Sequence, residues 1–184
     1  MMSRLLAIAV LAGLVAPATA RDSDPPASLY RFEAQLINQE SAAHGLDVYR
    51  GHPVLVTMFY GSCQASCPLI IDTLRATERA LAPRDRARLR VLMISFDPQR
   101  DTPAALGEIA RTRHIDTARW TLAHAEPADV RTLAALLDVQ YRQLPNGDFN
   151  HSTSIVLLSP AGEQEASTHA LGHADEALVK RLAR

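Results

Sequence analysis

The feature that most constrains the fold is an uninterrupted apolar run, Val54 to Tyr60 (VLVTMFY), which is followed at once by the chain's two cysteines, Cys63 and Cys67. A run of β-branched and aromatic residues of this kind is typical of a central strand that is buried on both faces. Pro68 then suits the first turn of a helix that reads LIIDTLRATERAL. The sequence therefore predicts that the cysteines join the end of a buried strand to the start of a helix.

The rest of the chain alternates strands with helices in the same way. A strong reversal signal, Pro145-Asn146-Gly147-Asp148, is expected to separate two of the strands. Strands are expected at 91–96, 120–123, 141–144, 153–158 and just after the Pro160-Ala161-Gly162 turn, and helices at 103–111, 127–137 and 175–182. This alternation predicts an α/β layer structure with several parallel strand pairs.

Ahead of the buried strand, the pattern predicts a β-hairpin. Apolar residues alternate from Leu29 to Leu36, and Leu46 to Tyr49 is expected to return as their partner before the Gly51-His52-Pro53 turn. A strand that leads into a cysteine pair at a helix start, followed by further α/β units, is the layout of the thioredoxin fold. We therefore expect an α/β, thioredoxin-like fold, with a central mixed sheet flanked by helices and an N-terminal β-hairpin extension.

Residues 1–20 have the features of a cleaved secretory signal peptide. Arg4 is followed by an apolar run, Leu5 to Ala16, and then by the small-x-small tripeptide Ala18-Thr19-Ala20. The run is shorter than the roughly 20 residues that a membrane span needs. We expect removal after Ala20 and a periplasmic protein, and the alternative is that the uncleaved segment anchors the protein to the inner membrane.

The remainder of the chain is expected to hold a flexible leader, 21–28, and one domain, 29–184, which is a normal length for a single core. The composition bears on partners as well as on size. The chain carries 19 Lys and Arg against 20 Asp and Glu, and only 5% of its residues are aromatic. Since there is also no basic run, nothing in the composition supports binding to nucleic acid.

The cysteine pair allows three interpretations: a structural disulfide, a redox couple or a metal clamp. A disulfide would close so short a loop that it would stabilise the fold little. The redox and metal interpretations both need a thiolate, which the N–H groups and dipole of a helix N-terminus favour. Residues four apart share one helix face, with Cβ atoms about 5–6 Å apart, which suits two sulfurs on one ion. A disulfide also fits this separation after small adjustments, so both interpretations stay open.

A metal clamp needs a third ligand, and His151 is the leading candidate. It stands in FNHSTSIVLL, immediately before an apolar strand, and in a thioredoxin fold the loop into that strand faces the cysteine helix. The alternative is a loop histidine bonded to backbone groups. His169 and His173 also have ligand-like spacing, but no cysteine is close to them in sequence. Surface or structural roles are expected for the others, His44, His52, His114 and His124.

Three stretches carry a resemblance to a known family: GHPVLVTMFYGSCQASCPLI, ISFDPQRDTP and FNHSTSIVLLSPAG. In order and approximate spacing they resemble the Sco/SenC family of copper-binding, thioredoxin-like proteins, and the resemblance runs from about Leu29 onward. Members are implicated in delivering copper to the binuclear copper site of cytochrome c oxidase, or in keeping the cysteines of that site reduced. The resemblance implies that Cys63, Cys67 and His151 are copper ligands.

The same resemblance places Asp97 and Asp101 in the family's acidic motif, although Asp101 suits the start of the following helix equally well. The chain also departs from the family's pattern. Members usually carry proline after the first cysteine and often an acidic residue next, whereas this chain has Gln64 and Ala65, and Asn150 stands where an aspartate is common. These changes leave the ligand types intact, but they bear on partner recognition and redox tuning.

Two leading functions and one further hypothesis are consistent with these observations. The first is a metallochaperone that is not an enzyme. It would bind copper as Cu(I), with Cu(II) as a further candidate, and pass it to a cuproprotein such as a cytochrome c oxidase copper subunit. Soft thiolates favour Cu(I), whereas a structural zinc site normally closes with four protein ligands.

The second function is a thiol–disulfide oxidoreductase that acts on the cysteines of a copper-site partner. Cys63 would be the nucleophile, Cys67 would resolve the mixed disulfide, and His151 would adjust the thiolate. Another copper chaperone or a thiol reductase is the further partner expected for these functions. A thioredoxin-like interaction module with a vestigial site is the third hypothesis.

Overall fold

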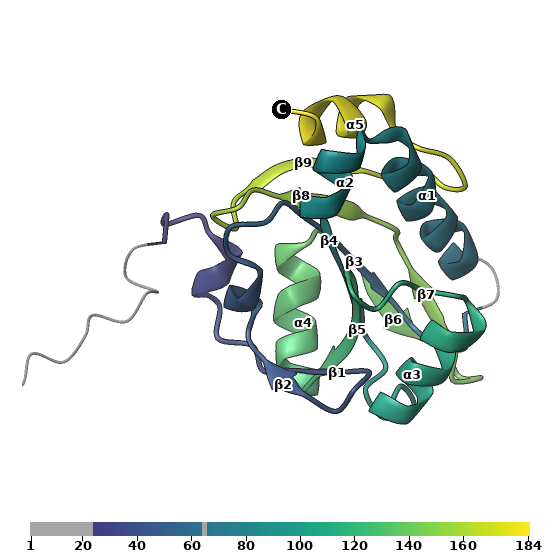
Figure 1. Ribbon diagram of the computed structural model, residues 1–184. Coiled ribbons are helices and arrows are strands. Elements are labelled where there is room, and N and C mark those ends of the chain that lie inside the picture. The colour runs from purple at the N-terminus through teal and green to yellow at the C-terminus, as the bar shows by residue number, and fades with distance from the viewer. Residues whose placement is uncertain (1–23, 64–65) are drawn as a thin grey trace, which may run out of the picture.

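The structure is a computed structural model that describes residues 24–63 and 66–184 (Figure 1). Two predicted features lie outside the described residues. They are the signal peptide, 1–20, and the departure from the family pattern between the cysteines, Gln64 and Ala65. Within the described part of the chain, no helix combines the length and apolar character that crossing a membrane requires.

The centre of the fold is a mixed sheet whose strands lie in the order β2-β1-β5-β4-β3-β8-β9 across the described residues. β3, β4 and β5 are parallel, and β8 runs antiparallel beside β3. The strands are β1 (Leu36–Asn38), β2 (Ala43–His44), β3 (Val54–Phe59), β4 (Arg90–Ser95), β5 (Trp120–Ala125), β8 (Ile155–Leu158) and β9 (Gln164–Thr168). Every residue of β3 and of β8 is buried, as the continuous apolar runs predict.

Helices flank this sheet, with α4 on one side and α1 and α5 on the other (Figure 1). They are α1 (Ser66–Ala80), α2 (Pro83–Arg88), α3 (Pro103–Thr112), α4 (Pro127–Leu136) and α5 (Glu176–Leu182). All except α2 were predicted within a few residues. α2 was missed because its sequence, PRDRAR, has no apolar stripe, and none of its residues is buried.

The N-terminal extension does contain a hairpin, but its strands are not the predicted ones. Leu29–Arg31 and Leu46–Tyr49 form short 3₁₀ helices, and the hairpin pairs β1 with β2. The first 3₁₀ helix forms because the Ser28 hydroxyl accepts a hydrogen bond from the Tyr30 N–H at 3.1 Å. β1 also pairs with β5, so the extension continues the main sheet. In the predicted leader, Asp24 forms an ion pair of 2.6 Å with Arg50.

The predicted strand 153–158 is present as β8 (Ile155–Leu158), but it does not directly follow the turn at 145–148. The turn at 145–148 joins β6 (Tyr141–Gln143) to β7 (Phe149–His151), and these two strands form a separate small sheet. The chain then changes sheets, because the Ser152 N–H bonds back to Gln140 whereas the Ser154 carbonyl accepts from the Thr57 hydroxyl of β3 at 2.8 Å. This break leaves His151 at the end of the β6–β7 hairpin.

Candidate metal centre

The two cysteines lie where β3 leaves the sheet and α1 begins. The Cys63 N–H donates to the Tyr60 carbonyl at 3.2 Å, which turns the chain back toward the helix, and Cys67 lies in the first turn of α1. Both are free thiols that are only 5% exposed. The Cys67 N–H donates to Cys63 Sγ at 3.3 Å, and Cys67 Sγ donates to the Tyr60 carbonyl at 3.6 Å. The start of the helix therefore points a backbone donor at one sulfur.

These contacts give the two sulfurs opposite acidities. Burial alone raises the pKa of Cys63, but hydrogen bonds from Ser66, from the Cys67 thiol and from the Cys67 N–H outweigh it and lower that pKa to about 6. Burial and the hydrogen bond to Cys63 both raise the pKa of Cys67. At neutral pH the pair therefore consists of one thiolate and one thiol, a state in which Cys63 is ready to act as nucleophile or ligand.

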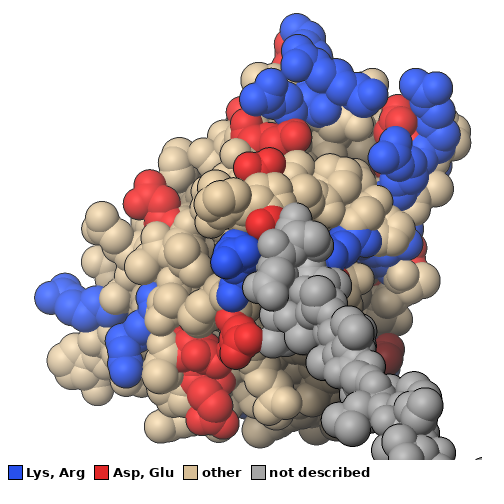
Figure 2. All heavy atoms as spheres, turned by 90° about the vertical axis from the view of Figure 1, so that its left-hand side faces the viewer, with Lys and Arg blue, Asp and Glu red and all other residues tan. Residues whose placement is uncertain are grey.

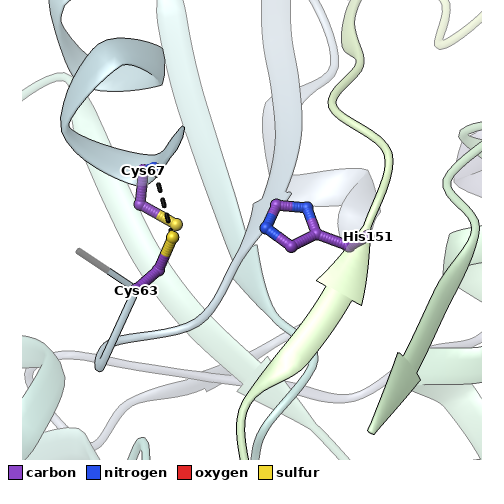
Figure 3. Close-up of side chains that lie close together, drawn as sticks. All are labelled: Cys63, Cys67 and His151. Atoms are coloured by element: carbon purple, nitrogen blue, oxygen red, sulfur yellow. Dashed lines mark hydrogen bonds between the residues drawn. The ribbon is translucent and has the colours of Figure 1, made fainter. Parts of the chain in front are cut away.

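His151 faces this pair from the end of β7, and its ring points toward the sulfurs (Figure 3). Its Nδ1 lies 2.9 Å from the Ser152 carbonyl, which can only accept, so Nδ1 carries the proton. Nε2 is then an acceptor and lies 3.2 Å from the Ser66 hydroxyl. The Sγ atoms of Cys63 and Cys67 and a ring nitrogen of His151 all lie within 4.8 Å of one another. The three predicted residues are thus brought together.

An aromatic cluster holds the histidine in this position. The His151 ring lies 5.0 Å from the Phe96 ring and 5.7 Å, edge-on, from the Tyr60 ring, measured between centroids. Phe96 also stacks on Tyr141 of β6 at 5.2 Å and contacts Phe149 of β7 at 5.0 Å. Through these contacts the residues that follow β3 and β4 hold both strands of the small hairpin.

Asp97 contributes to the same attachment without joining the metal-ligand group. Its buried carboxylate pairs with the Arg100 guanidinium, which donates in turn to the Gly147 carbonyl in the β6–β7 turn. The Arg100 Cζ also lies 5.8 Å from the centre of the Phe149 ring. Asp97 therefore positions the hairpin that carries His151, by way of Arg100.

Asp101 does not cap the helix that follows it, which was one of its two predicted roles. Thr102 caps α3 instead, with its hydroxyl accepting from the Ala105 N–H at 3.3 Å. The buried Asp101 carboxylate accepts from the Gly61 N–H at 2.8 Å and from the Ser95 hydroxyl. Burial raises the pKa of this carboxyl despite those two bonds. Asp101 thus fixes the end of β3 two residues before Cys63.

Ser66 was not predicted as a site residue, but its hydroxyl contacts both Cys63 and His151. Its hydroxyl is 3.4 Å from Cys63 Sγ as well as 3.2 Å from His151 Nε2. A signal for it exists in the sequence, because a residue three positions after Cys63 at a helix start faces the same side.

The other histidines take no part in the Cys63, Cys67 and His151 group, which is the group found in the described residues. His169 Nδ1 bonds the Thr153 carbonyl, and His173 Nδ1 bonds the Leu171 carbonyl at 3.0 Å. Backbone carbonyls likewise bond Nδ1 of His44 and His52. His124 belongs to β5, and His114 has a positive φ of 51° just past α3.

Comparison with known proteins supports the predicted fold. Arabidopsis thaliana ScoI with copper bound is 19% identical, with a TM-score of 0.70 over 81% of this chain and 92% of that one. Bradyrhizobium japonicum ScoI with copper bound is 23% identical, with a TM-score of 0.67 over 81% and 96%. BsSco, described with a disulfide switch as a member of the Sco family of cytochrome c oxidase assembly proteins, is 16% identical, with a TM-score of 0.66 over 82% and 90%.

These structures confirm the thioredoxin-like prediction, in which a central mixed sheet is flanked by helices. No curated protein matches the chain. The family match is the broader finding, because it runs over residues 23–184 and so includes the strand, the cysteine pair and the histidine hairpin. The chain therefore belongs to the SCO1/SenC family.

Proposed function

We propose that this protein is an exported Cu(I) carrier that binds the ion through Cys63, Cys67 and His151 and passes it to a cuproprotein in the periplasm. The observation that carries the proposal is the convergence of two sulfurs and one imidazole nitrogen within 4.8 Å, with no fourth protein donor in that group among the described residues. Two soft sulfurs and an imidazole suit Cu(I), whereas structural zinc would normally have four protein ligands.

Transfer of the ion is a ligand exchange. The Cys63 thiolate is already formed at neutral pH, so capture needs the loss of one proton, from Cys67, whose raised pKa makes that step depend on the metal. A three-ligand site leaves one side open to a donor atom of the acceptor. Since a related protein is described among cytochrome c oxidase assembly proteins, the binuclear copper site of that oxidase is the acceptor we propose.

A competition titration against a Cu(I) chelator, with reduced protein under anaerobic conditions, tests the carrier function. His151→Ala should weaken Cu(I) binding by about 10- to 100-fold or more, since loss of even an outer-shell partner has that effect. His173→Ala is the matched control, because His173 is exposed and, among the residues that the structure describes, its side chain bonds only to a backbone carbonyl. Protein oxidised to the Cys63–Cys67 disulfide should bind no Cu(I) at this site, and tight binding by that form would contradict the proposal.

The unequal acidity of the cysteines favours thiol–disulfide exchange as the second candidate function. The Cys63 thiolate would attack a partner disulfide and release one partner thiolate. Cys67 would then lose its proton and attack the mixed disulfide, which frees the reduced partner and leaves Cys63–Cys67 oxidised until a thiol reductase returns two electrons. Unchanged Cu(I) affinity in His151→Ala, together with an altered rate of Cys63 alkylation, would favour this function over copper carriage.

A further inference from the structure

A hollow of about 600 Å³ lies at the far end of α1, away from the cysteines. It is lined by Arg75, Glu78, Arg79, Pro83, Arg86, Ala87 and Arg119. Along α1, Arg79 lies about 18 Å from Cys67, at a rise of about 1.5 Å per residue. The hollow therefore lies at the end of α1 that leads into α2, and Cys67 lies at the opposite end of α1. Figure 1 shows the course of α1 between these two ends.

The wall of this hollow is strongly basic. Four arginines contribute to it, whereas its one carboxylate, Glu78, is buried and already paired with Arg119 at 2.6 Å. Arg119 is held further by Asp116 at 2.8 Å. These two acids leave an excess of positive charge, although the chain as a whole has a formal net charge of −1. Figure 2 shows another face of the molecule, on which Lys and Arg side chains stand at the upper end beside Asp and Glu side chains.

Several guanidinium donors around the hollow are unused. Among the described residues, neither the Arg79 nor the Arg86 side chain has a hydrogen-bond or ion-pair partner. Within the described part of the chain, the Arg75 side chain uses only Nη2, which donates to the carbonyls of Arg113 and, at 3.1 Å, His114. Those two bonds hold the Arg75 guanidinium in place with its other nitrogens free. The hollow therefore offers one guanidinium group that is held in place, that of Arg75, and two that can change position, those of Arg79 and Arg86.

We propose that this hollow binds a phosphate-type oxyanion. Arginine is suited to such groups because its planar fork donates two parallel hydrogen bonds to oxygen acceptors. A carboxylate has two coplanar oxygens and satisfies one fork, whereas a tetrahedral phosphate can meet Arg75, Arg79 and Arg86 from different sides. The volume is within the about 300–1,000 Å³ of small-molecule sites, so it admits the group that bears the phosphate. The excess positive charge excludes a metal cation.

The phosphate can come from a dissolved compound or from the headgroup of an anionic phospholipid, and the two sources share this chemistry. Inorganic phosphate tests the first, by calorimetry with the full chain. Sedimentation with vesicles of phosphatidylglycerol and phosphatidylcholine, against vesicles of phosphatidylcholine alone, tests the second. Because the arginines are accessible to solvent, binding in either arm should weaken as salt is raised from low to about 0.5 M.

The decisive variants remove two arginines each from neighbouring positions. Arg79→Ala/Arg86→Ala removes the two unpaired guanidinium groups of the hollow. Arg84→Ala/Arg88→Ala removes the same amount of charge from two α2 residues that do not line the hollow. The first should weaken binding by about tenfold or more, the loss expected when hydrogen bonds to a charged group are removed, and the second should leave it within about twofold. Retained Cu(I) binding by both variants, measured at the other end of α1, will verify that they fold.

Each outcome decides the proposal. Loss of binding that is confined to Arg79→Ala/Arg86→Ala supports the hollow as the binding site. The experiment in which this loss is seen, with inorganic phosphate or with vesicles, identifies the source of the phosphate. Equal loss in both double variants would mean that net charge alone attracts the anion, and would overturn the proposal. Absence of binding by the wild-type chain to inorganic phosphate and to anionic vesicles would overturn it as well.

Discussion

Replacing Ser66 by alanine tests the chemistry of Cys63 at a single atom. The Ser66 hydroxyl lies 3.4 Å from Cys63 Sγ and 3.2 Å from His151 Nε2. It has one proton for two acceptors, since His151 Nδ1 is the protonated nitrogen of the ring. The proton therefore goes to the thiolate when Cys63 is ionised, because charge-assisted hydrogen bonds are the stronger ones. Ser66→Ala removes that donor and leaves the Cys67 N–H in place.

The size of the effect can be estimated. A hydrogen bond to a charged group contributes about 1.5–3 kcal/mol, and the half-buried position of Ser66 favours the low end. At 1.36 kcal/mol per pKa unit, the pKa of Cys63 should rise by about one unit in the variant. Because the wild-type pKa of Cys63 is about 6, the thiolate fraction of Cys63 at pH 6 would fall from about one half in wild type to about one tenth in the variant. Alkylation at that pH should therefore slow about fivefold, and the two rates should converge above about pH 9.

The assay is the rate of iodoacetamide alkylation of reduced, metal-free protein as a function of pH. Below about pH 8 it reports Cys63, because burial keeps Cys67 protonated. Ser62→Ala is the matched control, since Ser62 is exposed and adjacent to Cys63 in sequence, and among the described residues its side chain bonds nothing. Ser66→Thr, which keeps the hydroxyl, should restore the wild-type midpoint. Identical midpoints for wild type and Ser66→Ala would refute the reasoning.

Three further predictions concern the support of the site and export. Gly61→Ala places a Cβ against the Asp101 carboxylate and 2.9 Å from Ile109 Cδ1. The unfolding free energy measured with urea should therefore fall by about 1–3 kcal/mol, and an unchanged urea midpoint would contradict this prediction. Burial raises the pKa of Asp101, so the protonated carboxyl stabilises the fold at low pH, and this contribution is lost as pH rises through the raised pKa. The unfolding free energy of wild type relative to Asp101→Asn should therefore fall as pH rises through that range, whereas a difference that stays constant with pH would argue against the raised pKa. We predict that the protein is exported and that N-terminal sequencing finds the mature chain beginning at Arg21; an intact 1–20 segment in a membrane fraction would exclude a cleaved signal peptide.

The cysteine half of the site was predictable because its signals are local. The run from Val54 to Tyr60 is apolar at every position, so it has to be buried on both faces, and the strand that forms there is fully buried. Cys67 and Pro68 stand in the first helical turn, as the motif indicates. The position of His151 near the cysteines was predictable for a related reason, since it precedes an apolar segment that joins β3 in the sheet.

The histidine hairpin was predicted less well because strand partners are not a local property. A turn at 145–148 indicates that the chain reverses, but an alternating pattern on either side does not say which residues pair. The apolar segment 155–158 gains more from the main sheet, where it is fully buried, than from the exposed β6. The 3₁₀ helix Leu46–Tyr49 was predicted as a strand for a similar reason, because it buries two apolar residues three apart within a segment too short to show a period.

The two halves of the site are therefore held by different forces. Cys63 and Cys67 are fixed between a fully buried strand and the first turn of a helix, so displacing them would disturb the core. His151 belongs to a two-stranded sheet, and such a hairpin is marginally stable by itself. Here it is held by ring contacts to Phe96 and Tyr60 and by the bond from Arg100 to its turn. Because segments with fewer buried contacts open at lower free energy, displacement of the imidazole costs less than displacement of either sulfur. Exchange of a bound ion with an acceptor would accordingly begin on the histidine side, while both sulfurs stay in place.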